Sequence, residues 1–583
     1  MIKTLLGSIG EYKKDSLLTP LFVMLEVCFE VMIPFVMASL IDKGISAGDQ
    51  GLVLRLGALL LAAAMMALLF GVLSGRTAAI AAAGFAKNLR RDIFKNVQSF
   101  SFANIDKFST SSIITRLTTD VTNIQQSYQM IIRMAVRSPI MLTFTLIAAF
   151  RINHQLSLIF LGAIPVLGVG LILIIKKAHP LFRLVFKTYD GLNNLVQENV
   201  RGMRVVKAFV REDHEKKKFS EISREIYEKF SQAEKTIAFI MPLIQFCIFG
   251  SMLLLSWFGA RAIIASGNSA ALGLTTGQLM SLMIYVMQIL ISLMILSMIF
   301  VMITMSRASA ERIVEILREK SDLQNSADPL FEIADGGIEF ENVSFSYSAQ
   351  EDKKVLENIN LKIASGETIG IIGGTGSAKT SLVQLIPRLY DPLDGKVKVG
   401  GRDVREYDLG ALREQIAFVL QKNILFSGTI SDNLRWGKKD ATLEEIKEVA
   451  SIAQAKGFIE DYAEGYDTRL EQGGSNVSGG QKQRLSIARA LLKKPKILIL
   501  DDSTSAVDTA TEERLKNEFA KRLKETTKII IAQRISSVQD ADRIVVMDNG
   551  RINAIGTHQE LLADNLIYRE VYESQIRGGN LHV

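Results

Sequence analysis

Cysteine is scarce in this chain, which has two cysteines among 583 residues. They are Cys28 and Cys247, and each lies within an apolar run. Two cysteines exclude a disulfide-stapled scaffold and a cysteine-based zinc site. Their surroundings indicate that both are packing residues.

A large excess of one charge is also missing. The chain has 68 Lys+Arg and 61 Asp+Glu, a formal net charge of +7. Charged residues make up 22% and hydrophobic residues 48%, which excludes an intrinsically disordered chain. The small basic excess is concentrated in particular loops, so membrane topology explains it better than nucleic-acid binding, and no nucleic-acid partner is expected.

Long apolar runs are present, and they are confined to the first 305 residues. A helix needs about 20 mostly apolar residues to span a bilayer. Six segments qualify: Leu17–Ile41, Leu52–Leu73, Met130–Phe150, Leu156–Ile175, Ile237–Ile264 and Leu279–Thr304. The first begins too late, and carries too many acidic residues, for a cleaved signal peptide. The sequence therefore predicts an α-helical polytopic membrane domain over residues 16–306.

The distribution of positive charge predicts the orientation. The two long intervals between spans, Ser74–Gln129 and Lys176–Thr236, carry 7 and 14 lysine and arginine residues. The three short intervals carry only Lys43 and Arg151. Basic loops stay in the cytoplasm, so both termini are expected there. Residues 1–15 are expected to form an amphipathic elbow helix on the inner membrane surface, with a flexible tail as the alternative.

The long intervals have the composition of helices, with many Ala, Lys, Arg and Glu residues. We expect the membrane helices to continue through them into the cytoplasm, with turns near Phe102–Ser109 and Phe209–Glu215. Those turns are where the membrane domain could contact a second domain.

Two acidic residues interrupt the first span. Glu26 and Glu30 are four residues apart, so they share one helix face. Because acids within a bilayer face a cavity or a partner, they are candidates for a cavity that accepts cationic substrates. The alternatives are pairing with Arg133 or Arg137 of the third span, or exposure near a water-filled cytoplasmic opening.

Methionines follow one face of the last span, and Met283, Met287 and Met294 are candidates for the same cavity. Methionine is polarizable and adaptable, which suits a promiscuous apolar surface. A packing seam between helices explains the same spacing equally well.

The sequence changes character after Ser306. We expect a linker over 307–337 and an α/β domain over 338–583. In that domain, the strand-like run Glu367–Ile372 leads into a glycine-rich loop. The loop consists of Gly373, Gly374, Thr375, Gly376, Ser377, Ala378, Lys379 and Thr380, followed by Ser381. Backbone N–H groups of such a loop bind phosphates, and Lys379 and Thr380 are expected to bind the β- and γ-phosphates and Mg²⁺.

Two further motifs support this interpretation. Lys496–Asp501 is an apolar strand that ends in a carboxylate, which places Asp501 near Mg²⁺. Between the two strands, Val477, Ser478, Gly479, Gly480 and Gln481 open an apolar helix. The bare N–H groups of that helix form a second phosphate-binding device. A chain with two such half-sites is expected to form a head-to-tail dimer that encloses two nucleotides.

These motifs resemble those of the ATP-binding cassette (ABC) superfamily, in the exporter type with six spans followed by one P-loop nucleotide-binding domain. The resemblance covers essentially the whole chain. It implies that Tyr347 stacks on adenine and that Gln421 senses Mg²⁺. It also implies that Asp508, in the segment formed by Ser505, Ala506, Val507 and Asp508, reaches across the dimer, and that the two cytoplasmic turns are coupling helices.

Three residues depart from the family pattern. Asp502 stands where the family has a glutamate that polarises the attacking water, and Gln533 stands where it has a histidine that contacts the γ-phosphate. Asp is one methylene shorter than Glu, and Gln carries no charge and transfers no proton. Ala378 replaces a glycine of the phosphate loop.

All three departures fall in the site formed by this chain's own Walker motifs, whereas its signature helix is intact. This pattern resembles one subunit of a bacterial heterodimeric multidrug exporter in the plasma membrane, with hydrophobic or cationic drug-like substrates. The partner would be a second half-transporter that carries the glutamate and the histidine. Tolerated drift in an active homodimer, a lipid or peptide exporter, and an ATP-gated regulator or channel remain alternatives.

Overall fold

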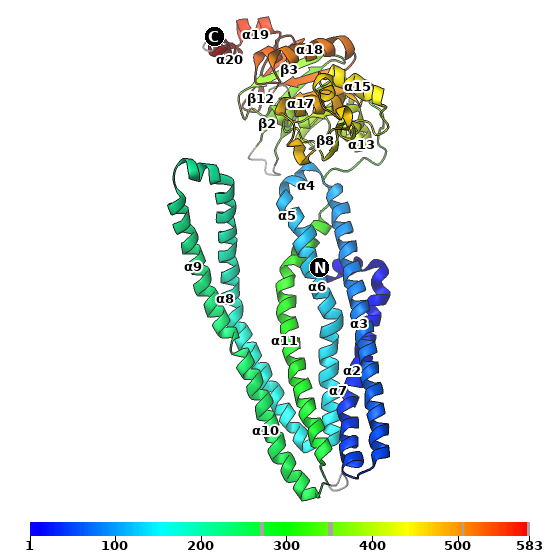
Figure 1. Cartoon of the computed structure of the whole chain (residues 1–583). Coiled ribbons are helices and arrows are strands. Elements are labelled where there is room, and N and C mark those ends of the chain that lie inside the picture. The colour runs from blue at the N-terminus through cyan, green and yellow to red at the C-terminus, as the bar shows by residue number, and fades with distance from the viewer. Residues whose placement is uncertain (269–272, 348–353, 504–506, 580–583) are drawn as a thin grey trace. The chain divides into compact units, whose positions relative to one another are not determined.

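The computed structural model describes residues 1–268, 273–347, 354–503 and 507–579 (Figure 1). These residues form two compact units. The first unit comprises 1–98 and 110–319, and the second comprises 99–109 and 320–583. The short segment 99–109 therefore belongs to the second unit although it lies between helices of the first.

The first unit is entirely helical in the residues that the structure describes. Its α-helices are α1 (Ile2–Gly7), α2 (Lys13–Ser39), α3 (Gln50–Gln98), α5 (Thr110–Thr115), α6 (Val121–Met130), α7 (Val136–Ile152), α8 (His154–Ala208), α9 (Glu212–Ile237), α10 (Ile240–Ser266) and α11 (Thr276–Arg318). Wider turns η2 (Leu40–Ile45), η3 (Arg116–Asp120) and η4 (Ile131–Ala135) continue these helices, and η1 (Gly10–Tyr12) is a single 3₁₀ turn.

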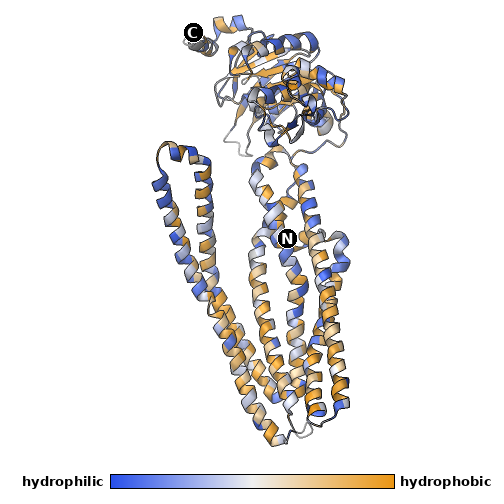
Figure 2. Cartoon of the chain, in the orientation of Figure 1, coloured by the Kyte–Doolittle hydropathy of each residue, from blue (hydrophilic) through white to orange (hydrophobic). Residues whose placement is uncertain are grey.

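Within the described part of the chain, six helical stretches are long and apolar enough to cross a bilayer, which confirms the six predicted spans. Figure 2 shows apolar bands along these helices and more hydrophilic residues along α9. Helix α3 has 49 residues. At about 1.5 Å per residue this exceeds the ~30 Å apolar core of a bilayer by more than twofold, so α3 continues well beyond the membrane.

Turns are present at both predicted positions, and local chemistry explains both. Ser101 caps the short helix α4 (Phe102–Lys107) by a capping box with Asn104. Helix α8 ends at Ala208, and α9 begins at Glu212 with three acidic residues in its first turn. Negative charge near a helix N-terminus is favourable, so the chain restarts there as a helix.

Hydrogen bonds join the N-terminal half of α11, with its capping residue Thr275, to α2 and to η2, which continues α2. Asp42 accepts hydrogen bonds from the Thr275 hydroxyl, at 2.5 Å, and from the Gly277 N–H, at 2.9 Å. The buried Tyr285 hydroxyl donates to the Val31 carbonyl at 2.8 Å. Because polar groups in an apolar environment are costly unless they are paired, these bonds specify which face of α11 meets α2.

An ion pair with one buried member joins the C-terminal half of α11 to η3, which directly precedes α6. The Asp120 carboxylate has 1% of its side chain exposed and accepts from the Arg312 guanidinium at 2.5 and 2.8 Å. The Ser309 hydroxyl also donates to it, at 2.8 Å. Helix α11 continues without a break to Arg318, so this pair lies directly before the chain enters the second unit.

The second unit is an α/β domain. Its strands are β1 (Ile338–Phe345), β2 (Leu356–Ile363), β3 (Thr368–Gly373), β4 (Asp394–Val399), β5 (Arg402–Asp403), β6 (Ile416–Val419), β7 (Gly428–Thr429), β8 (Arg469–Leu470), β9 (Ile497–Asp501), β10 (Thr527–Ile531), β11 (Arg543–Asp548) and β12 (Arg551–Gly556). Besides α4, its α-helices are α12 (Lys379–Gln384), α13 (Leu409–Gln415), α14 (Ile430–Arg435), α15 (Leu443–Ile452), α16 (Lys456–Glu460), α17 (Gly479–Leu491), α18 (Thr509–Arg522), α19 (His558–Asp564) and α20 (Leu566–Gly579).

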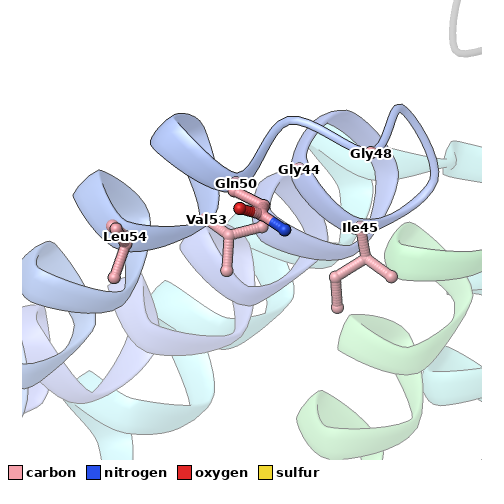
Figure 3. Close-up of a pocket in the computed structure, with 6 residues that line it drawn as sticks. All are labelled: Gly44, Ile45, Gly48, Gln50, Val53 and Leu54. Carbon is pink, nitrogen blue, oxygen red and sulfur yellow. The ribbon is translucent and has the colours of Figure 1, made fainter.

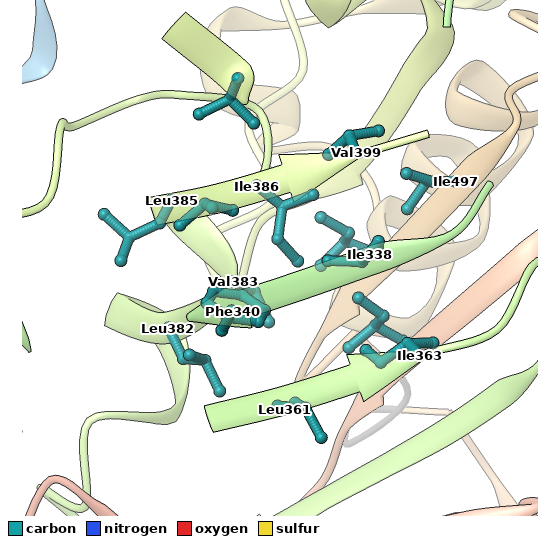
Figure 4. Packing of buried hydrophobic residues seen from close by; sticks show 14 of the residues in the cluster. Ile338, Phe340, Leu361, Ile363, Leu382, Val383, Leu385, Ile386, Val399 and Ile497 are labelled. Carbon is teal, nitrogen blue, oxygen red and sulfur yellow. The ribbon is translucent and has the colours of Figure 1, made fainter. Parts of the chain in front are cut away.

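One sheet carries the predicted nucleotide motifs. Its strand order is β12-β11-β3-β10-β9-β6, and β12 alone runs antiparallel to its neighbour. A smaller antiparallel sheet has the order β2-β1-β4-β5. Figure 4 shows how Ile338 and Phe340 of β1 pack with Val383 of α12 and Ile497 of β9 in one buried cluster. This core fixes the loop between β3 and α12.

A shallow hollow in the first unit lies at the connection between η2 and α3 (Figure 3). Its lining residues are Gly44, Ile45, Gly48, Gln50, Val53 and Leu54. None of these side chains is charged, and the Gln50 amide is the polar side-chain group among them.

The Asp120–Arg312 pair generates a stability prediction. Arg312→Met leaves the buried Asp120 charge without its ionic partner and should cost about 3 kcal/mol. Asp120→Asn should cost only about 1 kcal/mol, because the half-exposed Arg312 can turn to water. Thermal unfolding in detergent, monitored by the fraction of protein that stays monodisperse, ranks the two variants by unfolding temperature.

The control is Arg307→Met, which breaks the exposed Arg307–Glu311 pair on the same helix and should leave the unfolding temperature nearly unchanged. An Asp120→Asn protein less stable than the Arg312→Met protein would contradict the assignment of the buried charge as the costly group.

Candidate nucleotide-binding site

The glycine-rich loop connects the end of β3 to the start of α12, as predicted. A Cβ atom on Gly373 would lie 2.2 Å from the Met547 carbonyl oxygen, so glycine is required there for close packing. The Lys379 ammonium donates to the Gly373 and Gly374 carbonyls at 2.9 and 2.8 Å. The Lys379 side chain therefore lies across the glycine-rich loop. Burial lowers the pKa of Lys379, and the nearby charges of Asp501 and Asp502 oppose that shift.

Ala378 occupies a backbone conformation that favours glycine. It is the residue before α12 and has φ +68°, in the left-handed region. An L-residue there costs roughly 1–2 kcal/mol relative to its right-handed conformation. The methyl group packs against the domain core, which offsets part of this cost. The strain in this loop therefore comes from the backbone.

Thr380 and Asp501 come together at the carboxyl ends of β3 and β9. The Thr380 hydroxyl donates to the Asp501 carboxylate at 3.1 Å, and Asp501 is 2% exposed. Burial raises the pKa of Asp501, whereas the hydrogen bond from Thr380 lowers it. A hydroxyl beside a buried carboxylate fits Mg²⁺, which binds through one or two oxygen ligands and keeps several waters.

One carboxylate oxygen of Asp502 accepts hydrogen bonds from two glutamines, Gln533 and Gln421. Asp502 is also left-handed, with φ +47°, and follows β9 directly. Its Oδ2 accepts from the Gln533 amide at 2.8 Å and from the Gln421 amide at 3.4 Å. Two of the three residues that depart from the family pattern, Asp502 and Gln533, are therefore hydrogen-bonded to each other.

Tyr347 lies beside the phosphate loop. Its hydroxyl is 2.9 Å from the Ser381 hydroxyl and donates to Gln384 at 3.1 Å. Its ring packs edge-on against Tyr390, with centroids 5.2 Å apart. Burial raises the pKa of Tyr347, so its hydroxyl stays protonated and donates. The ring is half-exposed, which leaves one side available to a base.

The signature residues open α17, as predicted. Ser478 caps the helix, and Gln481 completes a capping box by accepting from the Ser478 N–H at 2.9 Å. Val477 is buried, whereas Ser478 and Gly479 are exposed and Gly480 is partly exposed. The first turn contains no acidic side chain. An anion can therefore approach the free N–H groups of this turn without repulsion.

The segment after β9 is described in part. Ser505 and Ala506 lie outside the described residues. Val507 is buried, and Asp508 caps α18 by accepting from the Thr511 N–H at 2.9 Å. The hydrogen bonds from Thr511 lower the pKa of Asp508.

Sequence reasoning missed the contact that attaches α4 to the domain core. The Tyr390 hydroxyl donates to Asp106 at 2.6 Å, and the Phe102 ring meets Tyr390 edge-on at 6.0 Å. Burial and the Asp106 carboxylate raise the pKa of Tyr390. Because Tyr390 also packs on Tyr347, one continuous aromatic contact links α4 to the loop. The aromatic residues Phe102 and Tyr390 were visible in the sequence, but their pairing across 288 positions was not.

The acidic residues of the first span are paired. Arg137 contacts Glu30 at 2.5 Å and Glu26 at 3.6 Å, and the Ser74 hydroxyl donates to Glu26 at 3.0 Å. The alternative of pairing with Arg137 is thus confirmed. Arg133 instead donates to the Gly71 carbonyl at 3.5 Å. Both acids remain candidates for a cavity, now as members of an ion-paired cluster.

The three candidate methionines lie on α11 and are partly buried. Met287 packs against a cluster that contains Leu282 and Tyr285, and Met294 packs against a different cluster. Within the described chain, these contacts favour the packing seam for Met287 and Met294. Met283 belongs to neither of these two clusters of described residues and remains a candidate for contact with a substrate.

Comparisons with known proteins agree with this geometry. Residues 17–293 match the family model of the ABC transporter transmembrane region, and residues 356–505 match the ABC transporter model. The chain is 36% identical to the ABC transporter ATP-binding protein YfiB of Bacillus subtilis over 95% of both chains. The chain belongs to the ABC transporter family. It is also 34% identical to the ATP-binding protein YknU of the same bacterium, over 84% of this chain and 83% of that one.

The fold of this ABC transporter chain has a solved counterpart. A bacterial Atm1-family ABC exporter with ATP bound superposes with a TM-score of 0.81, at 22% identity, over 97% of this chain and 98% of that chain. At this level of identity the likeness concerns the fold. It confirms the predicted fold class, in which a six-helix membrane domain precedes a nucleotide-binding domain.

The exposed side of Tyr347 generates a binding prediction. If adenine stacks on this ring, Tyr347→Ala should weaken ATP binding by roughly tenfold, the effect of losing one base–aromatic stack. Tyr347→Phe keeps the stacking surface and should bind within about twofold of the unchanged protein. Titration with a fluorescent ATP analogue measures both affinities. Equal losses in the two variants would show that the hydroxyl contacts to α12 matter and stacking does not.

Proposed function

We propose that this chain is one subunit of a heterodimeric, ATP-driven multidrug exporter, and that its own Walker site is degenerate. The observation that carries this proposal is the pair of Asp502 and Gln533. A general base must reach the attacking water to within hydrogen-bonding distance. The Asp502 carboxylate is one methylene shorter than glutamate, and Gln533 and Gln421 already donate to it.

Gln533 cannot replace a histidine in this position. An amide N–H₂ group donates hydrogen bonds but carries no charge and does not transfer a proton at neutral pH. Gln533 can therefore contact a γ-phosphate only as a neutral donor, which stabilises the charge that develops during hydrolysis less than a charged histidine does. ATP is expected to bind at this site and to be hydrolysed slowly or not at all.

Mg²⁺ would be held by Thr380 and Asp501, together with Gln421, and would neutralise charge on the β- and γ-phosphates. Lys379 would turn from the loop carbonyls to those phosphates. Lys379 now contacts a loop carbonyl, and Thr380 now contacts Asp501. ATP and Mg²⁺ can replace these contacts.

The partner would be a second half-transporter with an intact glutamate and histidine. The exposed N-terminus of α17 supports this part of the proposal, because its N–H groups can bind the phosphates of ATP held by another chain. The tip between α8 and α9 supports it as well. Phe209 is 72% and Val210 79% exposed there, and apolar side chains at such a tip suit docking to another protein surface.

In the proposed cycle, ATP binding closes the two nucleotide domains, and the cytoplasmic turns transmit this closure to the spans. The cavity then opens outward, and hydrolysis at the partner's site resets it. ATP that persists at the degenerate site would hold the domains partly together between cycles. We place the protein in a bacterial plasma membrane with both termini in the cytoplasm.

The substrates we propose are hydrophobic or cationic drug-like compounds. A lipid or peptide exporter of the same architecture is the second candidate, because the apolar face of α11 would also accept acyl chains. An ATP-gated regulator or channel is the third candidate. Vesicle uptake assays with a cationic dye, a labelled lipid and a peptide distinguish the exporters, and accumulation against a gradient distinguishes a pump from a channel.

Restoring the family residues generates a prediction for hydrolysis. The double variant Asp502→Glu with Gln533→His should raise ATP turnover of the assembled transporter by about a hundredfold at this site, the lower end of general-base effects. Single-turnover hydrolysis by protein whose partner site is blocked measures this step. The control is Asp502→Asn, which should leave turnover at this site unchanged. An unaltered rate in the double variant would contradict the degenerate-site assignment.

The ion-paired cluster generates a prediction for substrates. Replacing Glu26 and Glu30 by Gln should weaken transport of cationic dyes at least about threefold more than transport of neutral ones, because it removes negative charge from the spans. The triple variant with Arg137→Gln leaves no unpaired charge and controls for instability. Uptake into inside-out vesicles measures both dyes. Equal losses for cationic and neutral dyes would assign the cluster a structural role.

A further inference from the structure

The loop that carries Gln533 is held in place from outside the sheet. Strand β10 ends at Ile531, and the Ala532 N–H donates to the Ile371 carbonyl of β3 at 3.2 Å. The chain then leaves the sheet, and Gln533 extends its amide to Asp502. Past Ala532, the strand ladder no longer determines where the Gln533 backbone lies.

The side chain of Gln575, in the C-terminal helix α20, binds this backbone at two points. Its amide nitrogen donates to the Gln533 carbonyl at 2.8 Å, and its amide oxygen accepts from the Ile535 N–H at 2.9 Å. Only a side chain with a donor and an acceptor on one planar group can make both bonds at once, and glutamine has this geometry. The two bonds therefore hold the backbone on both sides of Arg534.

Helix α20 is firmly attached to the domain. Tyr568 is 1% exposed, and Tyr568, Val571 and Tyr572 pack in a cluster with Ala532 and Ile535. Positions 568, 571, 572 and 575 share one helix face, so Gln575 extends the face that is already packed against the loop. The Tyr568 hydroxyl also lies 2.6 Å from His558 Nδ1 of α19. The helix that carries Gln575 is therefore held in a well-packed core. We call the two hydrogen bonds from Gln575 to the loop the clasp.

We propose that Gln575 is a positioning residue of the nucleotide site. It fixes the backbone of the loop, and thereby the distance from the residue-533 side chain to Asp502 and to the γ-phosphate. A catalytic contact requires a placement accurate to well below about 1 Å. A loop that is free to move by about 1 Å would therefore lose the contact. The C-terminal helix is, on this account, part of the nucleotide site. The geometry holds whether or not this site hydrolyses ATP.

Hydrogen exchange of the full-length chain in lipid nanodiscs tests the clasp directly. Gln575→Ala should accelerate exchange in residues 533–537 by at least about threefold, because the Ile535 N–H loses its acceptor. Strand β10 and helix α19 should keep their protection. Gln575→Glu retains an acceptor for the Ile535 N–H but cannot donate to the Gln533 carbonyl, so its exchange should stay closer to that of the unchanged protein. Ser574→Ala, on the exposed neighbouring position, is the matched control and should change nothing.

A kinetic readout separates positioning from a purely structural role. In the assembled transporter that carries Asp502→Glu and Gln533→His, adding Gln575→Ala should lower kcat at this site by at least about threefold and leave the KM for ATP unchanged. Unchanged exchange in residues 533–537 of the Gln575→Ala protein would overturn the proposal. Loss of protection throughout α20 in both Gln575 variants, or equal changes in kcat and KM, would also overturn it, because either result assigns Gln575 to general stability. Failure of the double variant to hydrolyse ATP would count against the degenerate site and leave the exchange test intact.

Discussion

The hydrogen bond between the Gln533 amide and the Asp502 carboxylate is the interaction on which the functional account depends. Its length of 2.8 Å shows that the two unusual residues form one unit. An amide in this bond stabilises the carboxylate but cannot relay a proton. Thr380 and Asp501 lie beside the phosphate loop in an arrangement that fits Mg²⁺. In the proposed function, this pocket binds ATP and hydrolyses it slowly or not at all.

A second constraint runs along α11, which is polar where it must meet a particular neighbour. Asp42 binds its N-terminus, and Asp120 binds its C-terminal half through Arg312. Apolar side chains between helices in a bilayer specify orientation weakly, because lipid tails solvate them equally well. Paired polar groups specify it strongly, since a mismatch leaves a charge or an N–H unpaired. Both ends of α11 are therefore defined by a few bonds.

Much of the fold could be predicted from the sequence because its signals are local. The spans follow from apolar length, and the strands β3 and β9 follow from apolar runs that end in glycine or aspartate. The phosphate loop, the cap at Ser478 and the exchange of residues at 502 and 533 are all contiguous patterns. The two turns between long helices were predicted from the helical composition of the intervals that contain them.

Contacts between distant positions could not be predicted in this way. Nothing in the residues around Gln575 shows that its amide binds the loop at Gln533, 42 positions earlier. The choice of Arg137 over Arg133 as the partner of Glu30 depends on helix rotation, which periodicity alone does not fix. The left-handed backbone at Ala378 is also not visible in the sequence, since it follows from how the loop is held between β3 and α12. Each of these depends on tertiary packing.

The most direct test of the central claim is the ATP turnover of this chain purified and reconstituted in lipid without any other subunit. The account predicts binding of ATP with turnover at least about a hundredfold below the ~10 per second typical of enzymes. Rapid turnover by the chain alone, together with accumulation of substrate against a gradient, would contradict it.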